Sequence, residues 1–143
     1  MPLAEIIVVE QREWLQLLLK AEWPDLRTQI QAASTERGLI DLLPKSPYSF
    51  VVFHLAEDDT CQELARRITQ LRDQFPNAAL AAVGTAKLSH WEFALREAGL
   101  VHIQFDCRHF QDMFKMASRK LEQAPKVEKT FRETVWTRLP WNL

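Results

Sequence analysis

Residues 50–53 read Phe-Val-Val-Phe and residues 6–9 read Ile-Ile-Val-Val, and these two short runs decide the fold. Each run is apolar on both faces. A strand of this kind suits the centre of a parallel sheet that helices cover on both sides. The sequence therefore predicts that both runs are central strands.

Outward from these runs, strand and helix patterns alternate along the chain. A helix is expected over 12–22, where Trp14, Leu15, Leu18 and Leu19 form an apolar stripe. Further strands are expected at 26–32, 78–83 and 101–105, and further helices at 34–43, 57–73, 91–98 and 110–121. Each strand is thus followed by a helix, as in a chain that repeatedly crosses over a parallel sheet.

Local signals mark where several elements begin and end. Residues 26–32 alternate between apolar and polar, so one face is expected to be exposed, as at a sheet edge. Ser34 can cap the second helix, acidic residues 57–59 favour the start of the third, and Gly99 closes the fourth.

The repeated strand and helix pattern predicts an α/β fold: a doubly wound sandwich of the flavodoxin-like type. We expect a five-stranded parallel sheet in the order 2-1-3-4-5, with helices on both faces. The functional crevice of such a sheet lies at the carboxyl ends of strands one and three, where connections leave in opposite directions. Glu10, Gln11 and His54 are therefore expected to be neighbours.

Composition excludes several classes of function. The 143 residues include 18 Lys and Arg against 19 Asp and Glu, so the formal charge is −1. A near-neutral chain has no sustained positive electrostatic field that would attract nucleic acid. The three glycines, Gly38, Gly84 and Gly99, lie too far apart for a phosphate-binding loop. Cys61 and Cys107 lack metal-binding spacing, and no apolar run approaches the roughly 18 residues that span a membrane. We expect a cytoplasmic protein without cofactor, metal or membrane association.

The C-terminal extension, residues 123–143, differs from the domain formed by residues 1–122. It carries a net charge of +2 against −3 for the domain. Apolar residues at four-residue steps indicate a short helix there: Val127, Phe131 and Val135. Trp136 and Trp141 follow, and two alternatives stay open. They pack back on the domain, or they dock on another protein, since Trp and Arg are typical of binding hot spots.

Residues 4–122 resemble the receiver domain of bacterial response regulators in pattern and length. Receivers end strand one with a pair of acidic residues, where this chain has Glu10 and Gln11. They end strand three with the aspartate that is phosphorylated, where this chain has His54 in the run Val51-Val52-Phe53-His54-Leu55. The resemblance therefore implies a receiver fold in which the acceptor aspartate is replaced.

The later strands depart from receivers as well. Receivers end strand four with Thr or Ser, where this chain offers Gly84 or Thr85, and strand five with Lys. Counting from Gly99 puts Asp106 at the lysine position, and a negative charge there would repel a phosphoryl group. A one-residue shift brings Phe53, Leu55, Phe105 or Cys107 instead, and none restores the chemistry. The degenerate pocket is therefore not expected to be phosphorylated on aspartate: Glu10, Gln11, His54, Thr85 and Asp106.

His54 has several possible roles at this strand end. An imidazole over the crevice can accept a phosphoryl group, ligate a metal or sense pH, with Glu10 orienting it. The simpler interpretation is that a half-buried ring fills the vacated pocket and hydrogen-bonds to Glu10 or Gln11.

The leading hypothesis is a pseudo-receiver with no enzymatic activity. It would act as a protein-protein interaction or regulatory module in signal transduction, through a protein partner or a homodimer. Phe93 is expected to point outward, and the resemblance implies an interaction face on the fourth helix, fifth strand and fifth helix. Trp136 and Trp141 are further candidates for such contacts. The alternative is a small-ligand or metal-binding domain that uses the crevice around Glu10, His54 and Asp106.

Overall fold

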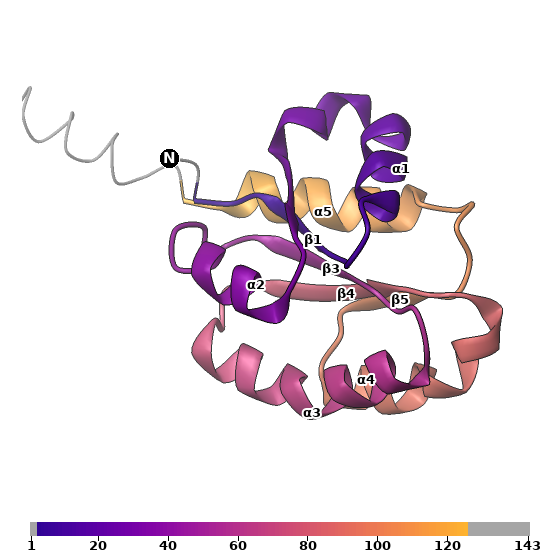
Figure 1. The fold of residues 1–143 in the computed structure, drawn as a ribbon. Helices are drawn as coiled ribbons and strands as arrows, with labels where there is room; N and C mark the ends of the chain where they lie inside the picture. The colour runs from indigo at the N-terminus through magenta and orange to yellow at the C-terminus, as the bar shows by residue number, and fades with distance from the viewer. Residues whose placement is uncertain (1–2, 126–143) are drawn as a thin grey trace, which may run out of the picture.

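The computed structural model describes residues 3–125, which form five strand and helix units (Figure 1). The elements are β1 (Ile6–Val9), α1 (Trp14–Glu22), β2 (Ile30–Ala33), α2 (Glu36–Leu42), β3 (Phe50–His54), α3 (Asp58–Gln74), β4 (Ala79–Val83), α4 (Glu92–Ala98), β5 (His102–Gln104) and α5 (Gln111–Gln123). Two short 3-10 helices, η1 (Pro24–Gln29) and η2 (Ala86–Trp91), precede β2 and α4.

The five strands form one parallel sheet in the order β2-β1-β3-β4-β5, which confirms the predicted topology. Val9 of β1 pairs with Phe53 of β3, and His54 pairs with Val83 of β4. Glu10 follows Val9, so the register carries it to the row of His54. The chain leaves β1 and β3 toward opposite faces of the sheet, and this switch point is where the crevice was expected.

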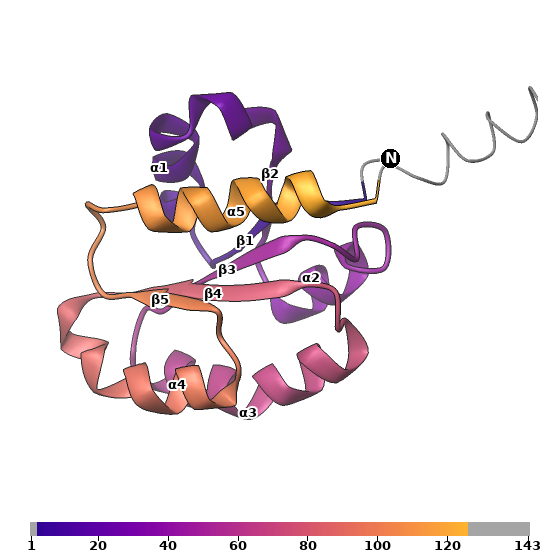
Figure 2. The same ribbon diagram turned by 180° about the vertical axis from the view of Figure 1, so that it is seen from behind.

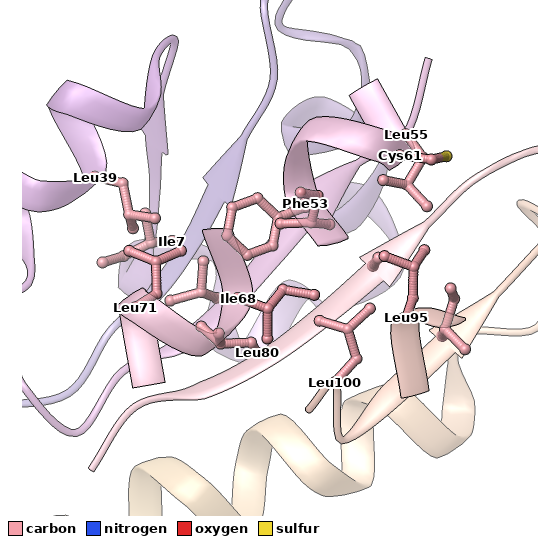
Figure 3. Packing of buried hydrophobic residues seen from close by; sticks show 14 of the residues in the cluster. Ile7, Leu39, Phe53, Leu55, Cys61, Ile68, Leu71, Leu80, Leu95 and Leu100 are labelled. Carbon is pink, nitrogen blue, oxygen red and sulfur yellow. The ribbon is translucent and has the colours of Figure 1, made fainter. Parts of the chain in front are cut away.

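Helices cover both faces of the sheet, as the two views show (Figures 1 and 2). One core lies under α2, α3 and α4 and includes Ile7, Phe53 and Ile68, which approach one another in Figure 3. The other core lies under α1 and α5 and includes Val8, Leu19 and Met113. Successive residues of a strand point to opposite faces, so a central strand must be apolar throughout to serve both cores.

The predicted second strand was placed too early. Residues 24–29 form η1, and β2 begins only at Ile30, which pairs with Ile6. Pro24 has a fixed φ that suits the first turn of a helix, and this turn replaces the first half of the expected strand. The position of β2 at the sheet edge is confirmed.

The predicted cap of the second helix was also wrong by one residue. Thr35, not Ser34, is the N-cap of α2: its backbone is extended and its Oγ1 accepts a hydrogen bond from the Gly38 N–H at 3.1 Å. Gly99 does end α4, with a φ of +129° that favours glycine.

Helix α5 ends at Gln123, one residue beyond the predicted end of the domain. The expected helix around Val127–Val135 lies outside the described residues, as do Trp136 and Trp141. Within residues 3–125, no helix is long and apolar enough to cross a membrane.

Candidate functional site

A groove of about 830 Å³ lies at the carboxyl edge of the sheet, over the ends of β1 and β3. The loop between β2 and α2 and one side of α3, from Thr60 to Leu71, complete its walls. Glu10, Gln11 and His54 all line it, so the structure brings together the three residues expected to be neighbours. Neither Thr85 nor Asp106 is among the described residues that line the groove.

Glu10 is buried, and its carboxylate caps α1. Its Oε2 accepts a hydrogen bond from the Leu15 N–H and its Oε1 one from the Gln16 N–H, each at 2.8 Å. The residue at the N-cap position itself, Glu13, makes no side-chain capping bond. Glu10 therefore supplies the acceptors that the first turn of α1 needs, and its negative charge favours the positive end of the helix. Both oxygens of the Glu10 carboxylate are therefore engaged in capping α1.

The His54 ring lies beside the indole of Trp14 rather than on the carboxylate of Glu10. The two ring centroids are 5.3 Å apart with the planes tilted by 49°. Within residues 3–125 the ring makes no hydrogen bond, so the expected bond to Glu10 or Gln11 is absent there. Burial lowers the pKa of His54 below its ordinary value, and the nearby charge of Glu10 opposes this shift.

Trp14 was expected in the buried stripe of the first helix, and this was wrong. Its side chain is 48% exposed. Helix α1 packs on the sheet through Leu15 and Leu19, and Trp14 at its first turn is turned toward the groove instead. The helical spacing could not reveal this, because an apolar stripe contains residues at the centre of the buried face and residues at its solvent-exposed edge, and spacing does not distinguish the two.

The charged side chains of the groove are predominantly acidic. They are Glu10, Glu36, Glu57, Glu63, Arg12 and Arg67, which give a net charge of −2. The Nε of Arg67 lies 3.7 Å from the Oε2 of Glu36, which forms an ion pair. Within the described part of the chain, Glu57 and Glu63 form no ion pair, so the α3 wall carries two uncompensated carboxylates.

The ends of β4 and β5 are closed by apolar packing. A Cβ added at Gly84 would lie 3.2 Å from the Leu55 Cβ and 3.5 Å from the Phe105 Cδ1. Leu55 is fully buried, and Phe105 packs against the same core. Phe105, rather than Asp106, thus stands beside the end of β4, which corresponds to the one-residue shift considered in the sequence.

Asp106 and Thr85 lie elsewhere and serve local structure. Asp106 Oδ1 accepts hydrogen bonds from the N–H groups of Arg108 and His109, at 3.1 and 3.2 Å, in the turn before α5. These bonds, the Arg108 one foremost, lower the pKa of Asp106. Thr85 is exposed and precedes η2, where its carbonyl accepts from the Leu88 N–H.

The residues brought together do not form a metal centre. Within residues 3–125, no group of three or more His, Cys, Asp or Glu side chains is placed to hold a metal ion. Glu10 and His54 share the groove, but Asp106 is not part of it. The alternative of a ligand held by all three residues therefore has no support in this geometry.

Sequence reasoning missed the α3 side of the groove. Glu57 was considered only as part of the acidic start of the third helix, and Glu63 was given no role, yet both line the groove that contains Trp14 and His54. A signal was available, since α3 follows directly from the end of β3 and its first turns must border any crevice there. Phe93 was correctly expected to point outward and is 76% exposed.

Comparison with known proteins shows which solved structures share this fold. No family model matches the sequence, and no curated protein matches it. Solved structures do match. A response regulator from Thermotoga maritima superposes with a TM-score of 0.68 at 14% identity, over 84% of this chain and 98% of that one. A CheY-like protein from Pseudomonas aeruginosa PAO1 gives 0.60 at 15% identity, over 81% and 98%.

A third structure, described as an adenylate cyclase from Rhodopirellula baltica, has a TM-score of 0.57 at 13% identity, over 97% of this chain and 100% of that one. At these identities the likeness is one of fold. Together with the strand order, it shows that this chain has the flavodoxin-like fold of response-regulator receiver domains.

Proposed function

We propose that this chain is a receiver-like module of signal transduction that works through protein contacts, without enzymatic activity and without phosphorylation on aspartate. The observation that carries the proposal is the state of the strand ends. His54 stands at the end of β3, and the carboxylate of Glu10 is committed to the first turn of α1. The receiver fold is kept, while the groups that receiver chemistry needs are replaced or used for structure.

Each replacement acts against phosphoryl transfer. Aspartyl phosphorylation needs a carboxylate nucleophile and a hard cation on oxygen ligands. An imidazole with a lowered pKa beside one engaged carboxylate offers a poor site for Mg²⁺. A cationic side chain that would stabilise the incoming charge is replaced by the ring of Phe105 beside Gly84.

Exposed apolar side chains support a role in protein contacts. Of the five large exposed hydrophobic residues within positions 3–125, three are on α4, just before β5, and on α5: Phe93, Val101 and Met116. Strand β5 is an edge strand, so this end of the molecule can take a partner or a second copy. Both cysteines are free thiols in the structure, which fits the cytoplasm as the place of action.

Intact-mass spectrometry after incubation with acetyl phosphate and Mg²⁺ tests the first part. We expect no gain of a phosphoryl group and no change in the spectra on addition of beryllofluoride. A stable adduct on any aspartate would overturn the proposal. A phosphoryl group on His54, absent from a His54→Gln variant, would overturn it as well, because the chain would then be a phosphoacceptor of another kind.

Analytical ultracentrifugation of the wild type and of a Phe93→Ser variant tests the contact face. In the homodimer case, we expect the wild type to self-associate and the variant, whose dimer is weaker, to be dissociated already at higher protein concentration than the wild type. Leu17→Ser is the matched control, since Leu17 is a 60% exposed residue on α1, away from the proposed face. Equal effects of the two substitutions would count against the α4, β5 and α5 face.

A further inference from the structure

The groove combines an aromatic wall, an apolar floor and an acidic rim. Trp14 and His54 form the wall, and Phe53, Leu64 and Leu71 contribute apolar surface. Glu57 and Glu63 stand on the α3 side without ion pairs among the described residues. A 48% exposed tryptophan in the same groove as uncompensated carboxylates suits a segment that brings both aromatic and cationic side chains.

The chain itself contains such a segment outside the described residues. Residues 126–143 carry a net charge of +2, opposite to the −2 of the groove. Arg138 lies between Trp136 and Trp141 in the sequence, the combination that anchors many interfaces. No other part of the sequence places two tryptophans so close to an arginine.

We propose that the groove is the docking site of the chain's own C-terminal segment, residues 126–143, bound in cis. The segment would then cover Trp14 and His54, and a partner that uses the groove would have to displace it. This inference does not depend on the proposed function, because it holds whether or not the chain is phosphorylated.

The length of the segment allows this docking. Helix α5 begins after the carboxyl end of β5 and runs back along the sheet, so its last turn lies at the opposite edge from the carboxyl ends of the strands (Figure 2). The 13 residues of α5 span about 20 Å, and a small domain is roughly 30 Å across. Docking requires residues 126–136 to be extended rather than to form the helix suggested by the spacing of Val127, Phe131 and Val135. Extended, residues 126–136 reach up to about 37 Å and residues 126–141 up to about 55 Å, which is enough to return around the domain.

Because the segment is tethered to its own domain, docking in cis is favoured over docking on a second copy of the chain. A segment joined to the domain within reach of its site has an effective concentration on the order of 1 mM. A second copy at micromolar concentration would need a correspondingly higher affinity to compete. Opposite net charges add an attraction that salt screens, since the Debye length falls from about 10 Å at 0.1 M to about 3 Å at 1 M.

The test uses the full chain and the indole N–H signals of Trp14, Trp136 and Trp141 in NMR spectra. The groove variant is Glu57→Gln with Glu63→Lys, which changes the groove from −2 to +1. The matched control is Asp73→Asn with Glu97→Lys, which makes the same total charge change at exposed positions outside the groove. The tail variant is Trp136→Ala with Trp141→Ala, which leaves every described residue unaltered.

In the groove variant, we expect the Trp136 and Trp141 signals to move to the positions found in 1 M salt, and the control to keep the wild-type positions. The Trp14 signal of the tail variant should move to the position that the wild type shows in 1 M salt. Unchanged tail signals in a folded groove variant, or an unchanged Trp14 signal in the tail variant, would overturn the proposal.

Dilution separates the two possible sources of the segment. Docking in cis predicts the same Trp14, Trp136 and Trp141 signals from 10 to 500 μM, whether or not the domains self-associate through the α4, β5 and α5 face. Signals of these three residues that change with concentration as a dimer forms would assign the groove to the tail of a second copy and overturn docking in cis. Tail signals at free positions in the wild type would also overturn it and leave the groove to a different partner.

Discussion

Replacement of Glu10 by alanine gives the sharpest test of whether its buried carboxylate stabilises α1. The substitution removes the two acceptors that hold the Leu15 and Gln16 N–H groups at 2.8 Å. Glu10 is 7% exposed, so water has little access to the amides that lose their partner. An unsatisfied buried donor carries its full desolvation cost, and the first turn of α1 is expected to fray.

The magnitude follows from the two bonds. Hydrogen bonds to a charged group contribute about 1.5–3 kcal/mol each, and loss of a helix cap costs roughly 0.5–2 kcal/mol. Because the two figures describe the same interactions, we expect Glu10→Ala to lower the free energy of unfolding by about 2–3 kcal/mol. Glu10→Gln keeps one acceptor oxygen, so its loss should be about half as large.

Urea unfolding followed by circular dichroism measures this loss. With a urea dependence of about 2 kcal/mol per M, the Glu10→Ala midpoint should fall by about 1–1.5 M. Glu13→Ala is the control, since Glu13 is an exposed neighbour that makes no capping bond. Its midpoint should stay within the small range of ordinary surface substitutions, about ±0.5 kcal/mol.

A different outcome would refute the capping role. If Glu10 were held in reserve for a cation, its removal from the metal-free chain would relieve a buried charge and leave stability unchanged or higher. A loss below about 0.5 kcal/mol for Glu10→Ala, or equal losses for Glu10→Ala and Glu13→Ala, would show that the two hydrogen bonds do not stabilise α1.

Three further predictions follow from buried or constrained groups. Burial lowers the pKa of His54 below its ordinary 6.5, so as the pH falls the unfolded chain takes up the proton before the folded chain does. The free energy of unfolding should therefore decrease as the pH drops from 6.5 through the folded pKa, and the urea midpoint should be lower at pH 5 than at pH 7. In a His54→Gln variant the contribution of this histidine to the difference between the two midpoints should disappear. Gly99→Ala should lower stability by about 1–3 kcal/mol because φ is +129°, whereas Gly38→Ala inside α2 should raise it by about 0.5–1 kcal/mol; similar thermal shifts for both would contradict the backbone argument. Burial raises the pKa of Cys61 to about 11, so in a Cys107→Ser variant at pH 8 the Cys61 thiol should react with a disulfide reagent only after unfolding, and rapid labelling of the native chain would disprove its burial.

The sequence predicted most of the fold because its strands and helices carry strong local patterns. β1 and β3 are apolar throughout, and a strand covered on both faces has no other stable composition. The weaker pattern before β2 was misread, since alternation over residues 26–32 does not distinguish an edge strand from the turn that Pro24 starts. The burial of Trp14 was predicted wrongly for a related reason: residue spacing identifies the apolar face of a helix but does not show which residues at the edge of that face are exposed.

Taken alone, the sequence determined the order of the elements, the crevice edge of the sheet and the presence of His54 rather than a carboxylate at the end of the third strand. These depend on residue type and on position along the chain. Only the tertiary structure decided that Glu10 caps α1, that Phe105 rather than Asp106 stands beside Gly84, and that α3 gives the groove an acidic wall. Each of these depends on the distance between groups on different elements, and that distance is set when the helices pack on the sheet.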